Sequence, residues 1–183
     1  MIQAVEGQER LYPCRTDSLE ILTDSAGPGE WRGGMGIEKK ATLLEVQNCV
    51  MSYICDRERA VVWGIKGGLP AQPQGLSLTL PGSNEKFLGT VFSNYPVEKN
   101  SKFRRHTSGG GGYGDPLKRD PMRVLEDVVD DYVSLERARK DYGVVLSIVD
   151  LDLAEYSLDV EETKKLRDHI KKGFTLTTPT MTK

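Results

Sequence analysis

The sequence predicts an α+β fold, in which a β-rich unit of sandwich-like or barrel-like form is followed by a short helical C-terminal segment. Short runs of alternating or β-branched residues, separated by turns rich in Gly and Pro, fill the first part of the chain, as is typical of β units. Beyond residue 116 the apolar residues recur at helical spacing. Between the two patterns, five of the six residues 109–114 are glycine, which is disfavoured inside helices and strands.

This change of pattern divides the 183 residues into four predicted segments. Residues 1–11 form a polar N-terminal arm, and residues 12–116 form a β-rich domain that ends in the glycine loop. Residues 117–173 form the helical C-terminal segment, and residues 174–183 form a tail with several threonines. The length suits one domain, or one domain with an appendage.

Four stretches of the β-rich domain are predicted strands. Residues 76–80 alternate apolar and polar side chains cleanly, which is typical of a strand with one buried face. The alternation over residues 12–22 is less regular but opens in an extended pattern. Residues 87–92 and 102–107 are two further strands, with a loop around Tyr95 between them.

A hairpin is expected between residues 41–46 and 49–55, with its turn near Asn48. The composition of residues 41–55 also allows a helix. We favour strands because β-branched and aromatic residues recur there and no capping signal precedes them.

Local capping signals predict two helices after the glycine loop. Asp120 followed by Pro121 marks a helix start, because an aspartate N-cap accepts a backbone N–H and proline fits the first helical position. Ser134 caps a second, short helix that ends at Gly143. Residues 144–149 are rich in Val and Ile and predict a further strand.

A third helix is predicted from a capping box, in which Glu162 follows Asp159 by three residues. Glu161 and Lys165 stand four residues apart in this helix. We expect them to form an ion pair, since residues at i and i+4 are neighbours on a helix surface.

Composition is that of an ordinary globular protein. The net charge is −2 and the pI is about 5.8, so no global positive field favours nucleic acid or acidic lipid. None of the three cysteines forms a C-x-x-C pair, which argues against a disulfide framework or a structural zinc site. No apolar run approaches the ~20 residues of a membrane span, and the first ten residues lack the features of a signal peptide. We therefore expect a cytoplasmic protein that binds neither nucleic acid nor membrane.

The glycine loop does not match a known nucleotide-binding signature. A P-loop needs Lys and then Ser or Thr after its last glycine, whereas Gly114 is followed by Asp115 and Pro116. The dinucleotide-binding pattern needs a continuous path from strand through loop to helix, which the proline interrupts. The loop is therefore interpreted either as a lid or as a close-packed crossing. Residues 64–75 are a weaker candidate, for an anion-binding nest.

Two sites near glycines have competing interpretations. His106 either orients a substrate or donates to an anion, or it is a polar residue at the end of a strand, which we favour. Trp31 and Arg32 are expected to anchor a loop, with the indole buried and the guanidinium over it or paired with a carboxylate. The alternative is that Arg32 contacts an anion.

Several motifs, taken together and in order, closely resemble the C-terminal part of the hydantoinase B family. Each glycine motif alone is a weak signal, and the resemblance rests on their combination over nearly the whole chain. The motifs lie at residues 27–36, 63–68, 108–116, 127–134 and 138–146.

The resemblance implies a subunit of an ATP-dependent enzyme. Family members include cyclic-amide hydrolases (hydantoinase, 5-oxoprolinase, caprolactamase) and the acetone and acetophenone carboxylases. The implied scheme activates an amide or enolate oxygen by phosphorylation from ATP. A hydantoinase A-type partner supplies the nucleotide site, so ATP and Mg²⁺ belong to the assembled complex, and another divalent metal there is left open.

The same resemblance implies that this chain is inactive alone. Family members are several times longer, so a further chain is expected to supply the missing N-terminal part of hydantoinase B and to complete the substrate-side half of the enzyme. The alternatives are a non-catalytic structural module of such an assembly, or a free-standing binder of small ligands.

Residues carried over by the resemblance are candidates without assigned roles, and neither a catalytic residue nor a metal ligand is among them. The candidate loop anchor is Trp31 with Arg32. The candidate substrate-side loop consists of Gly109, Gly110, Gly111, Gly112, Tyr113, Gly114 and Asp115, with His106 before it.

Overall fold

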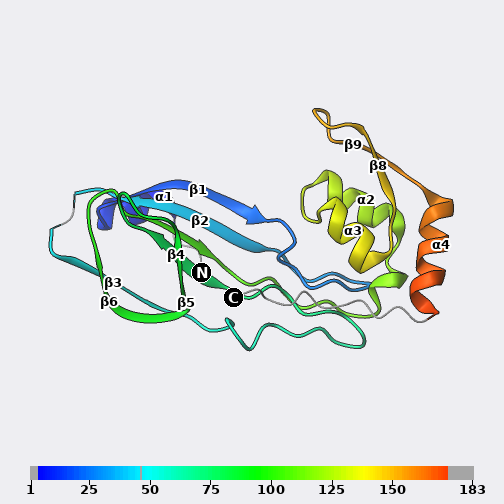
Figure 1. Ribbon diagram of the computed structural model, residues 1–183, viewed down its shortest axis with the longest axis horizontal. Helices are drawn as coiled ribbons and strands as arrows, with labels where there is room; N and C mark the ends of the chain where they lie inside the picture. Colours follow the sequence, from blue (N-terminus) through cyan, green and yellow to red (C-terminus); the bar gives the residue numbers. More distant parts are fainter. Residues whose placement is uncertain (1–3, 46, 173–183) are drawn as a thin grey trace.

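A computed structural model describes residues 4–45 and 47–172 of the chain. The molecule is elongated, with β strands at one end and helices at the other (Figure 1). Long loops run side by side between the two ends. The chain passes out from the strands and back twice, over residues 23–35 and 55–74, before residues 107–115 cross to the helices.

Five antiparallel strands form the main sheet, in the order β1-β2-β7-β4-β5. A second, two-stranded sheet pairs β3 with β6. The strands of the main sheet are β1 (Cys14–Leu22), β2 (Gly36–Leu43), β7 (Lys102–His106), β4 (Gly75–Thr79) and β5 (Lys86–Gly89). Those of the second are β3 (Cys49–Ile54) and β6 (Val91–Val97). Helix α1 (Val5–Leu11) contacts β1, where Glu9 accepts a hydrogen bond from the Thr16 amide at 2.6 Å.

The two sheets share one core, which makes this end of the molecule a small sandwich. Leu76 and Leu78 of β4 are almost fully buried, and they belong to one apolar cluster with Val97 of β6. Met51 of β3 and Phe103 of β7 pack against the same cluster from the two sheets. The predicted α+β class, with a β-rich unit before a helical segment, is confirmed, and the unit is of the sandwich-like form.

The predicted hairpin across Asn48 is wrong. Strand β2 pairs with β1 on one side and β7 on the other, whereas β3 pairs with β6 in the other sheet. Alternation of side chains predicts that a stretch is a strand, but it does not choose the partner. The single strand predicted over residues 87–92 is in fact two strands, because Gly89 at φ 82° and Thr90 turn the chain between β5 and β6.

The helical end begins after the glycine loop and follows the predicted caps. The Asp120 carboxylate accepts from the Met122 amide, Ser134 accepts from the Arg137 amide, and Gly143 ends the second helix at φ 61°. Strand β8 starts two residues later than predicted, and its partner β9 was not predicted. The elements are η1 (Pro116–Lys118), α2 (Pro121–Val129), α3 (Leu135–Tyr142), β8 (Leu146–Asp150), β9 (Glu155–Leu158) and α4 (Val160–Lys171).

The third predicted helix, α4, has the expected cap but a different ion pair. Asp159 accepts a hydrogen bond from the Glu162 amide at 2.9 Å. Lys165 pairs with Glu162 at 2.9 Å, three residues away, and not with Glu161 as predicted. Residues at i+3 and i+4 are equally close on an exposed helix face, so spacing alone does not choose between them.

A second apolar core fills the helical end. Val124, Ala138 and Val144 are completely buried, and the Tyr142 ring lies among them. The predicted limits of the arm, the β-rich domain and the helical segment stay a prediction, and the predicted tail at 174–183 lies outside the described residues.

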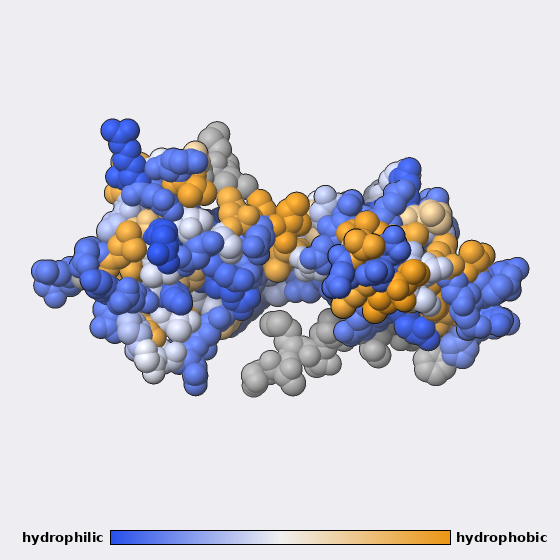
Figure 2. Space-filling view, turned by 90° about the horizontal axis from the view of Figure 1, so that it is seen from above, coloured by the Kyte–Doolittle hydropathy of each residue, from blue (hydrophilic) through white to orange (hydrophobic). Residues whose placement is uncertain are grey.

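The exposed surface is mainly polar with apolar residues gathered in places. Figure 2 shows hydrophobic residues near the middle of one face and over the helical end. Strand β1 lies on this face and leaves Leu19 and Ile21 exposed. Within residues 4–45 and 47–172, no helix combines the length and apolar character that crossing a bilayer requires.

Replacing Val124 by alanine is expected to destabilise the protein by roughly 1.5–3 kcal/mol, because it removes two methyl groups from a site with no solvent exposure. The matched control is Val129→Ala in the same helix, where the side chain is 46% exposed and the change is expected to stay within about 0.5 kcal/mol. Urea denaturation of both variants measures the difference. Equal effects would contradict the position assigned to the second core.

Candidate functional site

Three glycine-containing segments lie side by side between the two ends of the molecule. They comprise residues 27–34, 64–69 and 109–114, and together they are called the glycine bundle. Tyr113 in the third segment forms an antiparallel bridge with the first segment and a parallel bridge with the second. The bundle is therefore held by pairing between main chains that are distant in the sequence.

Main-chain hydrogen bonds connect the third segment to both of its neighbours. The Gly110 N–H donates to the Gly34 carbonyl at 2.8 Å, and the Gly112 N–H donates to the Leu69 carbonyl at 3.0 Å. Two further donors of this segment are Tyr113, to Trp31 at 2.9 Å, and Gly114, to Ile65 at 2.9 Å. Four N–H groups of the loop are thus already used inside the protein.

Glycine is required in the bundle because the backbones approach too closely for a side chain. A Cβ placed on Gly112 would lie 1.9 Å from the Pro28 carbonyl oxygen, and one on Gly33 would lie 1.9 Å from the Gly110 carbonyl oxygen. One on Gly68 would lie 2.1 Å from the oxygen of Gly112. These obstacles are main-chain atoms, so rotation of a side chain cannot relieve the contact.

This packing favours a close-packed crossing over a lid, because a lid could move only by breaking these main-chain hydrogen bonds. An anion-binding nest, the interpretation given for residues 64–75, needs several successive N–H groups free to face a ligand. The N–H groups of Ile65, Gly68 and Leu69 donate to carbonyls, as do four of the six N–H groups of the glycine loop. The loop therefore does not fit a phosphate group of ATP. It is a close-packed crossing between the two ends, and a substrate-side role for Gly109–Gly114 stays a prediction.

Asp115 ends the loop by capping the short helix η1. Its carboxylate accepts a hydrogen bond from the Leu117 amide at 2.9 Å. The preceding Gly114 has φ 76°, which a residue with a Cβ rarely adopts. Both residues thus fix the direction in which the chain enters the helical end.

Trp31 and Arg32 lie on opposite sides of the first bundle segment. Trp31 is 55% exposed, so the predicted buried indole is wrong. Neighbouring residues of an extended segment point to opposite faces, and here Arg32 takes the inner one. Its Nε lies 2.9 Å from Asp127, and its guanidinium carbon lies 4.8 Å from the Tyr132 ring centroid.

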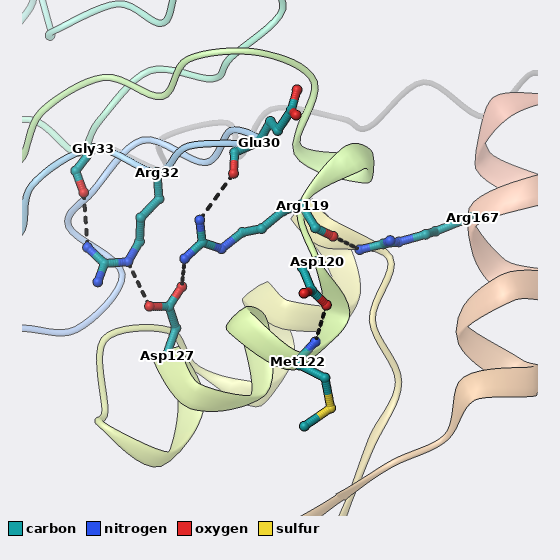
Figure 3. A network of polar contacts seen from close by, with 8 residues as sticks. All are labelled: Glu30, Arg32, Gly33, Arg119, Asp120, Met122, Asp127 and Arg167. Carbon is teal, nitrogen blue, oxygen red and sulfur yellow. Dashed lines mark hydrogen bonds and ion pairs between the residues drawn. The ribbon is translucent and has the colours of Figure 1, made fainter.

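Asp127 is the centre of a buried ion-pair network that ties the bundle to the helices (Figure 3). One carboxylate oxygen accepts from Arg32 at 2.9 Å, and the other accepts from Arg119 at 2.7 Å. Arg119 also donates to the Glu30 carbonyl at 3.1 Å, and Arg167 of α4 donates to the Arg119 carbonyl at 2.8 Å. Asp127 and Arg119 are 5% and 8% exposed, so each charge depends on its partner for stabilisation.

Sequence reasoning missed Asp127, although a signal for it exists. In helix α2 it lies three residues after Val124 and one before Val128, and both valines are buried. An acidic residue within the apolar face of an amphipathic helix indicates a buried partner of opposite charge.

His106 ends strand β7 and lies in the sheet, not in the bundle. It pairs in register with Glu38 and Gly75, and its ring centroid lies 6.4 Å from that of Phe87. Burial lowers the pKa of the imidazole. Nδ1 has no hydrogen-bond partner within the described residues, and a role in substrate binding stays a prediction.

A small cavity lies beside the ion-pair network. Its volume is about 10 Å³, and Asp24, Arg137 and Asp141 contribute to its wall, so it holds at most about one water molecule.

Arg137 Nε lies 2.6 Å from Asp141 without hydrogen-bond alignment, and burial raises the pKa of the Asp141 carboxyl group. Nowhere in residues 4–45 and 47–172 do three His, Cys, Asp or Glu side chains gather as metal ligands would.

Comparison with known proteins places this fold within longer enzymes. Residues 1–116 match the model of the hydantoinase B/oxoprolinase family. An uncharacterized protein of Methanocaldococcus jannaschii is 35% identical over 89% of this chain and 28% of its own. A putative D-/L-hydantoinase chain of the B type, from Pseudomonas sp. strain NS671, is 31% identical over 89% of this chain and 26% of its own.

Two solved structures contain a similar fold. A nucleotide-free structure of acetone carboxylase has a TM-score of 0.82 at 22% identity, over 94% of this chain and 26% of that one. The crystal structure of ATP-dependent caprolactamase from Pseudomonas jessenii has a TM-score of 0.75 at 29% identity, over 92% of this chain and 28% of that one. The chain thus spans about a quarter of the length of these four proteins.

Replacing Gly112 by alanine is expected to destabilise the protein by several kcal/mol, because the new Cβ would overlap the Pro28 carbonyl oxygen. Gly34→Ala is the matched control in the same bundle, since a Cβ there meets nothing within 4 Å. Thermal denaturation followed by circular dichroism compares the two. A Gly112→Ala variant as stable as Gly34→Ala would show that the three backbones do not pack as described.

Replacing Asp127 by asparagine is expected to cost about 3–5 kcal/mol of folding free energy, because it leaves the buried Arg119 and the largely buried Arg32 without a carboxylate. Asp130→Asn is the control, since Asp130 is exposed at the end of the same helix. Chemical denaturation gives both values. A loss below about 1 kcal/mol at Asp127 would mean that the network contributes little to joining the two ends.

Proposed function

Since this chain belongs to the hydantoinase B/oxoprolinase family, we propose that it acts as one part of an ATP-dependent assembly that hydrolyses a cyclic amide or carboxylates a ketone. Its relatives include a putative hydantoinase chain of the B type and the beta chain of caprolactamase. They also include the alpha chain of acetone carboxylase. Both reaction types start from a carbonyl group that ATP can activate, which is why one family scaffold suits both.

The observation that carries this proposal is that the chain has the same fold as one part of two much longer enzymes and spans about a quarter of their length. The fold of nearly the whole chain recurs inside acetone carboxylase, where it makes up 26% of the chain. A catalytic centre built over the whole of such an enzyme is therefore only partly represented here. We propose that the chain completes the substrate-side half of the enzyme and is inactive by itself.

The nucleotide is assigned to a partner. Four of the six N–H groups of residues 109–114 donate to main-chain carbonyls, so the glycine loop does not offer a phosphate a run of free donors. ATP and Mg²⁺ are therefore proposed to bind on a hydantoinase A-type subunit, and a further chain is proposed to supply the rest of hydantoinase B. Because ATP is consumed, we place the assembly in the cytoplasm.

A purely structural role is the second candidate, and the glycine bundle favours it. Neighbouring backbones fill the space around the candidate residues 109–114, and few of the polar groups of this loop are free. On this alternative the chain supports the assembly without contacting substrate. The Tyr113 hydroxyl distinguishes the two roles, because Tyr113 is the one residue of this stretch with a side chain, and that side chain is 42% exposed.

The test is affinity purification of the tagged chain from its native cells, followed by mass spectrometry and activity assays. We expect two larger chains to co-purify, one of hydantoinase A type and one that matches the rest of hydantoinase B. The complex, but not the isolated chain, should consume ATP with hydantoin, a lactam or acetone. Recovery of the chain alone, or ATP turnover by the isolated chain, would overturn the proposal.

Within an active complex, Tyr113→Phe separates the two roles. The substitution keeps the main-chain pairing of Tyr113 and removes only its hydroxyl group. A drop in kcat/KM of about tenfold or more supports contact with substrate, whereas unchanged kinetics support the structural role.

A further inference from the structure

One face of the glycine bundle carries a row of three large side chains, one from each segment. Trp31 and Tyr113 exchange both of their main-chain hydrogen bonds, at 3.0 and 2.9 Å. Ile65 is bridged to Tyr113 from the other side through the bonds to Gly112 and Gly114. Residues paired directly across neighbouring extended segments point to the same face. Trp31, Tyr113 and Ile65 are called the bundle row.

The bundle row is exposed although its members are aromatic or aliphatic. Trp31 is 55%, Ile65 is 54% and Tyr113 is 42% exposed. A contiguous exposed row of this kind is typical of a surface that binds another protein. Tryptophan and tyrosine are enriched among the residues that carry most of the energy of such interfaces.

Two cations lie beside the aromatic members of the row. The Arg123 guanidinium carbon lies 5.2 Å from the Trp31 ring centroid, and Lys66 Nζ lies 5.5 Å from that of Tyr113. Across residues 4–45 and 47–172, neither cation forms an ion pair. A partner that covers the row and supplies carboxylates would satisfy both charges.

The glycine bundle beneath the row is already rigid. Main-chain hydrogen bonds join its three segments, and glycines at Gly33, Gly68 and Gly112 leave no space between the backbones. A partner would therefore lose little free energy in ordering this surface, which favours affinity for a given contact area.

We propose that the bundle row, with Lys66 and Arg123, is the docking surface for the polypeptide that supplies the rest of the hydantoinase B-type chain. The inference rests on the proposed function. This polypeptide is the proposed partner because about three quarters of the length of the similar proteins lies outside the part that this chain matches. That remainder needs a face of this fold on which to pack. A second copy fits less well, since a symmetric contact would bring the same unpaired cations together. The contacting segment is expected to carry apolar or aromatic side chains flanked by Asp or Glu.

The test compares tagged variants purified from the native cells. Mass spectrometry quantifies the complementary chain, defined as the one whose sequence matches the part of the caprolactamase beta chain that this protein does not cover. Trp31→Ala combined with Ile65→Ser is expected to reduce its recovery at least tenfold, and Arg123→Glu combined with Lys66→Glu is expected to do the same.

Two controls match these changes elsewhere on the surface. Tyr12→Ala removes an aromatic side chain that is 57% exposed, and Lys86→Glu reverses a cation 5.8 Å from the Tyr95 ring centroid. Both are expected to retain the complementary chain at the wild-type level. Melting temperatures of all variants confirm that the fold persists. A photo-crosslinking residue at Ile65 provides a second readout, which reports proximity to the partner, and it is expected to join the two chains covalently.

The outcomes separate this inference from the proposed function. If the wild-type chain captures the complementary chain and the row variants capture it equally, the docking surface is wrong and the proposed function stands. If the row variants fail and crosslinking at Ile65 succeeds, the docking surface is supported. If the wild-type chain captures no such chain, both are overturned.

Discussion

The closeness of three main chains is the constraint on which the rest of the structure depends. Outside β sheets, neighbouring segments of a protein usually pack through their side chains. In the glycine bundle there is no room for a Cβ at Gly33, Gly68 or Gly112, and the contacts are hydrogen bonds between backbones. The β sandwich and the helical end each have a separate apolar core. The bundle is what gives these two cores one fixed arrangement.

Charge completes what the backbone begins. Asp127 accepts from Arg32 of the bundle and from Arg119 beyond the loop, so one carboxylate connects two segments to helix α2. Arg167 adds α4 through the main chain of Arg119. Buried ion pairs of this kind add little net stability compared with apolar packing, but a wrong arrangement leaves a buried charge unpaired and is strongly disfavoured. The network therefore acts mainly to exclude other arrangements of the helices.

The capping signals in the sequence predict the helix starts correctly, whereas the predicted strand pairing is wrong. The caps at Asp120 and Ser134 were predicted correctly because each depends on residues within one helical turn. The hairpin at Asn48 failed because strand pairing is decided by distant partners. The glycine stretches were recognised as special, but their mutual packing involves main-chain atoms and leaves no pattern of side chains to read. The residue type of Trp31 predicts a buried indole. Its neighbour Arg32 points inward to Asp127, however, so the Trp31 side chain points to the opposite, exposed face.

The repeated passage of the chain between the two ends has a mechanical consequence. A single linker would let the sandwich and the helices swing about a hinge, whereas here residues 23–35 and 55–74 each run out and back before residues 107–115 cross. Bending the molecule between its two ends would have to break hydrogen bonds in several chain segments at once. The distance between the two ends is therefore held constant. Whatever one end holds is presented at a constant span from whatever the other end holds.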